Sequence, residues 1–195
     1  SDNNILYQAD NTPIAAWANA ANAAMLADAF MIAGKGDLMN QYKDAAIEAY
    51  NYASALPDQM LDAFQGAGIT TFRGRDLKMM AAAYLYNVTG NTIYEDVINE
   101  ETLIDGPTSR FVSSARTGGY NQLYANAAYI KTNRTVNYPS LRNNMISAAV
   151  YQAKQREANY STTRPSRRSI DNTQGWFHTQ QHVQRTILAH AVATD

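Results

Sequence analysis

Three histidines and a run of carboxylates are the residues of this chain whose spacing could support metal or acid–base chemistry. His178 and His182 are four residues apart, and His190 lies eight residues further on, so one helix would place all three on one face. This spacing can hold zinc, but the zinc-protease motif requires a glutamate directly after the first histidine, where this chain has Thr179. We therefore expect structural or sugar-contacting histidines, with no metal site and no cofactor.

The carboxylates gather in one short stretch, at Asp96, Glu100, Glu101 and Asp105. Such a run could bind calcium or take part in catalysis, but the solvated end of a helix is the simpler explanation. We assign no chemistry to this acidic run. The absence of cysteine from the sequence also excludes disulfides, thiolate metal sites and a cysteine nucleophile.

Composition and charge limit the classes of partner. The 195 residues carry 16 basic and 17 acidic side chains scattered along the sequence, so there is no field that would attract nucleic acid or anionic lipid. Charged residues interrupt every apolar run well before the length of about 20 residues that a membrane span requires. At 46% hydrophobic residues, the chain can bury the core of one helical domain over residues 1–195.

Apolar residues recur with helical periodicity, and no segment shows the sustained alternation of a half-buried strand. Gly34 and Gly90 mark two helix ends, and the pattern from Thr92 to Glu95 predicts a capping box at the start of the next helix. We therefore predict an all-α fold of repeated αα-hairpins without a sheet. The seven expected helices cover residues 13–33, 37–55, 76–89, 93–99, 120–132, 139–158 and 176–193.

Short and long connections alternate between these helices. The first, third and fifth connections are short turns, whereas the second, fourth and sixth are long, so all the long connections fall on one face. The first, third, fifth and seventh helices start at that face, and alanine-rich sequences in the first and third are typical of helices packed on most sides. We expect these helices to form a parallel inner layer, with the others antiparallel to them outside. Ligand chemistry is expected on the face of the long connections.

Aromatic residues near that face are the candidates for ligand binding. Sugar rings present C–H faces that pack on aromatic rings, while polar side chains at the rim bond the hydroxyl groups. Trp17, by contrast, lies within the first helix and is expected to be structural. The predicted binding residues are Trp176, His178, Tyr120, Phe72, Arg75 and Asp76.

The segment AAAYLYNVTGNTIYEDV, residues 81–97, resembles a helical hairpin of glycoside hydrolase family 9, the endoglucanase-type (α/α)6 barrels. Residues 17–53, 143–160 and 175–195 are similar to other hairpins of that family in the same order. The resemblance implies part of an (α/α)6 toroid, an oligo- or polysaccharide ligand, β-glucan hydrolysis with inversion and a secreted or periplasmic location. No signal peptide is visible in the sequence.

The chain departs from this family at the catalytic motifs. It has no Asp-x-Gly-Asp motif for the general base, and the general-acid glutamate would be expected beyond Asp195. Inverting hydrolysis requires two carboxyl groups about 6.5–9.5 Å apart, so we assign no catalytic residue and expect no hydrolysis of β-glucan by this chain alone. The interpretation is a central part of a larger catalytic domain.

Two other functions fit the same pattern. One is a helical-hairpin module that binds a peptide or protein partner, and the other is a different (α/α)6 polysaccharide-degrading enzyme. If the helices are part of a toroid, the first and last of them should expose apolar surface through which the chain self-associates. The residues expected at these two flanks are Trp17, Met25 and Phe30, and Ile187 and Leu188.

Overall fold

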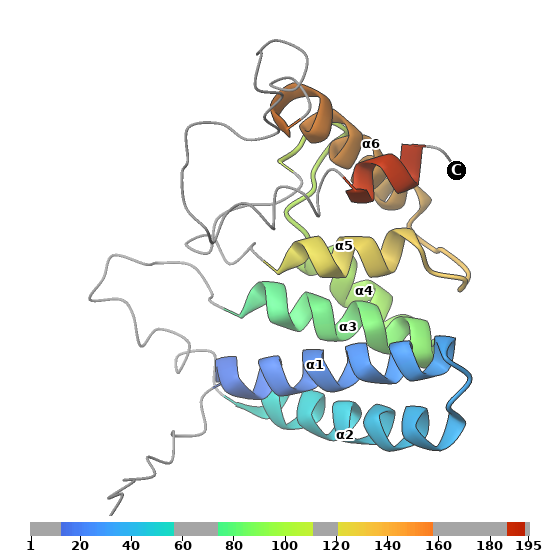
Figure 1. The fold of residues 1–195 in the computed structure, drawn as a ribbon. Coiled ribbons are helices and arrows are strands. Elements are labelled where there is room, and N and C mark those ends of the chain that lie inside the picture. Colours follow the sequence, from blue (N-terminus) through green and yellow to red (C-terminus); the bar gives the residue numbers. More distant parts are fainter. Residues whose placement is uncertain (1–12, 57–73, 111–120, 158–186, 194–195) are drawn as a thin grey trace, which may run out of the picture.

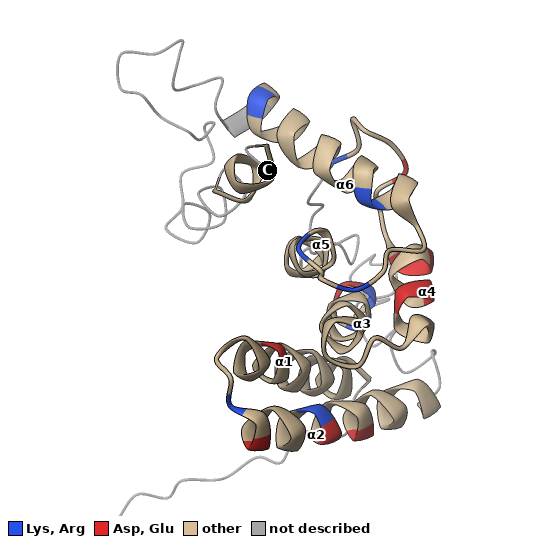
Figure 2. Ribbon diagram, turned by 90° about the vertical axis from the view of Figure 1, so that its right-hand side faces the viewer, with Lys and Arg blue, Asp and Glu red and all other residues tan. Residues whose placement is uncertain are grey.

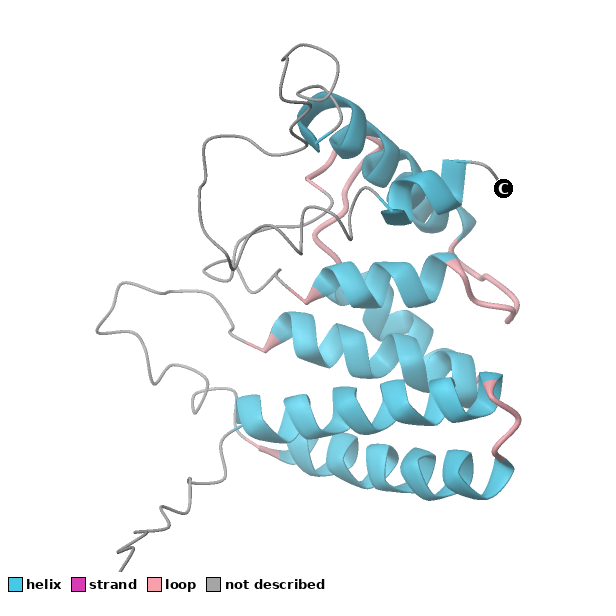
Figure 3. Ribbon diagram, in the orientation of Figure 1, coloured by secondary structure: helices cyan, strands magenta, loops and turns pink. Residues whose placement is uncertain are grey.

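The computed structural model describes residues 13–56, 74–110, 121–157 and 187–193, which form helices and the connections between them (Figure 1, Figure 3). No strand occurs within these ranges, so the all-α fold without a sheet is confirmed for them. A last helix spans 187–193, the described part of the predicted helix 176–193. The preceding elements are α1 (Pro13–Ile32), α2 (Gly36–Ala55), α3 (Arg75–Thr89), α4 (Thr92–Glu101), α5 (Gln122–Ile130), α6 (Pro139–Gln152) and the π-helical turn η4 (Ala153–Glu157).

Local signals explain where these helices begin and end. Pro13 and Pro139 open α1 and α6, at a position where the N–H that proline lacks would have no partner within the helix. α3 ends at Gly90, which adopts a left-handed φ of 72° and donates its N–H to the Tyr86 carbonyl at 2.8 Å. Three predicted helices differ from the structure by two or more residues at an end: α4 ends at Glu101 rather than at residue 99, α5 covers 122–130 rather than 120–132, and α6 gives way at Ala153 to a π-helical turn.

The start of α4 differs from the predicted capping box. Asn91, not Thr92, is the N-cap residue, and its Oδ1 accepts a 3.2 Å hydrogen bond from the backbone N–H of Ile93. Thr92 is already the first residue of the helix. The Glu95 side chain is completely buried and bonds to residues of α5 and the following connection, so it does not return to its own helix end. Bonds from Glu95 to residues far along the chain thus take the place of the predicted capping bond at the start of α4.

The helices form two layers that follow an arc (Figure 2). α1, α3 and α5 run side by side in the same direction on the inner side, whereas α2, α4 and α6 lie outside them (Figure 1, Figure 2). α1 packs against α2 and α3, and α3 packs in turn against α4 and α5. The described residues at which two of the long connections end, 74 and 121, lie at the end where α1, α3 and α5 start. Closure of the arc into a complete toroid stays a prediction.

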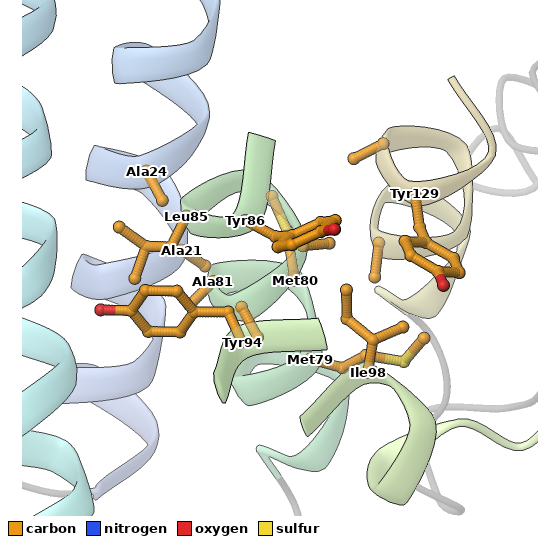
Figure 4. Packing of buried hydrophobic residues seen from close by; sticks show 14 of the residues in the cluster. Ala21, Ala24, Met79, Met80, Ala81, Leu85, Tyr86, Tyr94, Ile98 and Tyr129 are labelled. Carbon is orange, nitrogen blue, oxygen red and sulfur yellow. The ribbon is translucent and has the colours of Figure 1, made fainter. Parts of the chain in front are cut away.

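Small side chains allow α1 and α3 to approach closely. Ala21 and Ala24 of α1 face Ala81 and Leu85 of α3, and all four side chains are fully buried (Figure 4). α3 is surrounded on most sides, which agrees with the alanine-rich pattern of an inner helix. In α2 only Ala46, Tyr50 and Ala53 are buried, so this outer helix has the wet side expected of it.

Aromatic contacts join the inner and outer layers and correct one prediction. Trp17 meets Tyr50 edge-to-face with ring centroids 4.9 Å apart, and Tyr50 meets Tyr94 in the same way at 5.2 Å. Trp17 is only 4% exposed, so the expectation that it lies on an open apolar flank is wrong, whereas its structural role is confirmed. Met25 and Phe30 are also partly buried, and Phe30 stacks on Tyr42. Tyr50 of the outer helix α2 therefore covers Trp17 and is itself packed against Tyr94 of α4.

Candidate functional site

α3 starts at the end of the molecule where ligand binding was expected. Two of the predicted binding residues, Arg75 and Asp76, are in its first turn. Asp76 is 6% exposed, and its Oδ2 accepts hydrogen bonds from the backbone N–H of Asn121 at 2.7 Å and from Asn121 Nδ2 at 2.9 Å. Its Oδ1 accepts a third bond, from the N–H of Leu77 at 3.1 Å. Asp76 therefore ties the first turn of α3 to the residue that precedes α5.

Beside it, Arg75 and Lys78 enclose one carboxylate. Arg75 Nε and Lys78 Nζ donate to the two oxygens of Glu101, at 2.8 Å and 2.7 Å. The Glu101 side chain is 14% exposed, so a solvated helix end does not describe this member of the acidic run. The Arg75 side chain is 35% exposed, and besides the Nε bond its Nη2 donates to the Glu100 carbonyl at 3.4 Å, which leaves further N–H groups of the guanidinium for a ligand.

Gln122 completes this group of polar residues. It is 1% exposed, its Oε1 accepts from the N–H of Leu103 at 3.0 Å, and its Nε2 donates to the carbonyl of Glu101 at 2.8 Å. The end of α4 is thereby held against the start of α5. We name this group the start cluster; its members are Arg75, Asp76, Lys78, Glu101, Asn121 and Gln122.

The start cluster is suited to positioning and binding rather than to proton transfer. Both of its carboxylates are committed to hydrogen bonds or ion pairs within the chain, so neither is available as a general base in this arrangement. Arg75 is the member that can reach outward. Among the described residues there is no group of three side chains that could hold a metal ion, and no helix long and apolar enough to span a membrane.

The other predicted binding residues, Trp176, His178, Tyr120 and Phe72, lie outside the described ranges, so their role stays a prediction. The same holds for His182. Arg75 and Asp76 are brought together with Asn121, the residue that follows Tyr120 in the sequence.

A second polar network lies inside the molecule, away from the start cluster. The Glu95 carboxylate accepts bonds from the Tyr129 hydroxyl at 2.7 Å, from the N–H of Asn137 at 2.8 Å and from Asn137 Nδ2 at 2.6 Å. Burial, followed by the bond to Glu95, raises the pKa of Tyr129 well above its ordinary value of 10.0. The hydroxyl is therefore a permanent donor, and the network fastens α4 to α5.

A groove with a volume of about 570 Å³ lies at the opposite end of the inner helices, and sequence reasoning missed it. It includes Asp28, which is 9% exposed and whose pKa is raised by burial, an effect that a hydrogen bond from Asn87 opposes. Burial and the nearby charge of Asp28 raise the pKa of Tyr84, another lining residue, to about 12. The signal in the sequence is an aspartate on the stripe that Trp17, Ala21 and Ala24 share, because position 28 continues their helical spacing.

Comparisons with protein families, curated proteins and solved structures find no significant match to this chain. No residue role is therefore transferred from a relative. A functional interpretation therefore rests on the start cluster and on the residue types next to it in the sequence.

Proposed function

We propose that this chain is a saccharide-binding part of a carbohydrate-active hydrolase of the endoglucanase type, and that the end bearing the long connections is its binding surface. The observation that supports this most is the common direction of α1, α3 and α5, which brings their starts together at one end (Figure 1). Connections gathered on a rigid helical scaffold are where binding residues usually lie.

The start cluster makes this scaffold rigid at the place where a ligand would bind. Asp76 and Asn121 hold the starts of α3 and α5 together, and Glu101 holds Arg75 and Lys78. A side chain fixed in this way loses little conformational entropy on binding. Arg75, which is partly exposed, donates to saccharide hydroxyls in this proposal, and the predicted residues Trp176, Tyr120, Phe72 and His178 supply ring faces and further polar contacts.

The proposal assigns binding, not bond cleavage, to these residues. Asp76 has no free carboxylate oxygen, and Glu101 is neutralised by two cations. Inverting hydrolysis needs one carboxyl group as acid and a second one as base, with room for water between them. The start cluster offers no such pair, so the general acid and base of the proposed parent enzyme are other residues.

Calorimetric titration with cellohexaose tests the proposal, with maltohexaose as a probe of linkage. We expect saturable binding of cellohexaose and several-fold weaker binding by Arg75→Gln, since this variant loses a charged hydrogen-bond donor. The matched control is Lys43→Gln, which alters a lysine paired with the exposed Asp44 on α2. Thermal melts of both variants separate lost binding from lost folding. If the folded chain binds neither oligosaccharide, the proposal is overturned.

A further inference from the structure

The groove at the far end of the inner helices is a second candidate site, because it combines polar side chains, one of them with an unpaired acceptor, with an apolar lining. It lies where α1, α3 and α5 end, the end that faces the viewer in Figure 2. Its volume of about 570 Å³ falls within the range of about 300–1,000 Å³ that is typical of small-molecule sites. The lining consists of Asp28, Met31, Ile32, Tyr84, Asn87, Ala127, Ala128 and residues 131–134.

Two of the lining side chains, Asp28 and Asn87, offer acceptor oxygens. Asn87 Nδ2 donates to the Ala128 carbonyl at 3.3 Å, which fixes the orientation of the amide, and Asn87 Oδ1 is buried without a hydrogen-bond partner. Asp28, 9% exposed, adds a carboxylate on the neighbouring helix, which also accepts a hydrogen bond from Asn87. A buried acceptor without a donor is costly, so a ligand that brings N–H or O–H groups to this position would relieve that cost.

Charged residues at the rim of the groove restrict which kind of ligand can donate these hydrogen bonds. Lys131 and Arg134 are exposed there, and Arg134 is fixed by bonds from Nε to the Asn87 carbonyl and from Nη2 to the Val88 carbonyl, both at 2.8 Å. These cations disfavour a positively charged ligand, whereas the acceptors inside disfavour an anion. The lining therefore favours a neutral ligand rich in hydroxyl groups.

The apolar part of the lining fits the same ligand class. The Tyr84 ring, Met31 and Ile32 offer surfaces against which the C–H faces of a sugar ring can pack, and Ala127 and Ala128 leave room between the helices. We propose that this groove is a binding site for a neutral mono- or disaccharide, separate from the surface at the long connections. This inference does not depend on the proposed function, because it concerns the other end of the helices.

Amide chemical-shift mapping with cellobiose tests this site directly. We expect saturable shifts in residues 28–32, 84–88 and 127–134. Asp28→Asn removes a charged hydrogen-bond acceptor and should weaken cellobiose binding roughly tenfold. Asn87→Ala should also weaken cellobiose binding. Ala127→Trp should abolish it by filling the groove without removing a polar contact. The matched control is Ala49→Trp, which fills the separate groove between α1 and α2 and should leave cellobiose binding unchanged.

Choline and glucose 6-phosphate serve as a cationic and an anionic probe. Weaker binding of both than of cellobiose supports the inference, and tighter binding of either would overturn it. Shifts confined to residues 74–78 and 121–123 would overturn this second site while leaving the proposed function intact. Saturable shifts confined to the groove would support this site and contradict the proposed function, so the two failures are distinguishable.

Discussion

The hydroxyl of Tyr129 on α5 donates a 2.7 Å hydrogen bond to the carboxylate of Glu95 on α4, and both side chains are completely buried. Asn137 donates two further bonds to the same carboxylate. Three donors thus bond to one buried carboxylate. They come from α5 and from the connection that follows it. The network therefore links the α3–α4 hairpin to the α5–α6 hairpin.

Tyr129→Phe should lower the free energy of unfolding by about 1.5–3 kcal/mol, the usual worth of a hydrogen bond to a charged group. The ring and its packing are retained, so the loss reports the hydroxyl. Urea unfolding measures it. The control is Tyr52→Phe, on the exposed side of α2 at 47% exposure, where a change within about 0.5 kcal/mol is expected. Equal effects in the two variants would show that the Glu95 bond contributes nothing.

Asp76→Asn should destabilise the fold by about 1–3 kcal/mol, because it removes an acceptor from Asn121 and places a donor opposite another donor. The exposed Asp44→Asn, whose partner Lys43 is 3.5 Å away, should cost no more than about 1 kcal/mol. Unfolding of both variants in urea makes the comparison. If Asp76 served ligand binding alone, its variant would be as stable as the unaltered chain.

Asp28 makes the stability depend on pH. Burial raises its folded-state pKa above the ordinary value of 3.8, so the folded chain holds this proton more tightly than the unfolded chain does. Its contribution to stability is therefore full below pH 3.8 and is lost as the pH rises through the folded pKa. Asp28→Asn cannot undergo this loss, so its stability relative to the unaltered chain should increase from acidic to neutral pH. A pH-independent difference in urea unfolding would refute this.

We propose self-association through the apolar residues that the flanks do expose. Ile187 of the last helix is 61% exposed, as predicted, whereas on α1 the exposed large apolar side chains are Leu26 and Ile32, at 39% and 79%. Leu26→Glu and Ile187→Glu should weaken concentration-dependent association in sedimentation experiments without loss of helicity, and Asn19→Glu on the exposed side of α1 is the control. A chain that stays monomeric at high concentration would contradict this proposal.

Much of the fold could be predicted because its signals are local. Gly90, Pro13 and Pro139 fix helix ends through backbone geometry alone, and the alternating connections predict the two layers. The pairing of side chains could not be predicted, because it depends on residues far apart in the sequence. Glu95 fits a capping box locally but bonds to Tyr129 on another helix, and Asp28 joins a groove only after three helix ends come together.

Tryptophan fluorescence tests the central claim, that the chain binds a β-glucan saccharide at the end of the long connections. The sequence contains two tryptophans, and Trp17 is shielded by its contact with Tyr50 and only 4% exposed. In Trp17→Phe the emission therefore comes from Trp176 alone, and in Trp176→Phe it comes from the core. We predict a saturable change with cellohexaose in Trp17→Phe and none in Trp176→Phe. No change in a folded Trp17→Phe, or an equal change in both variants, would contradict the claim.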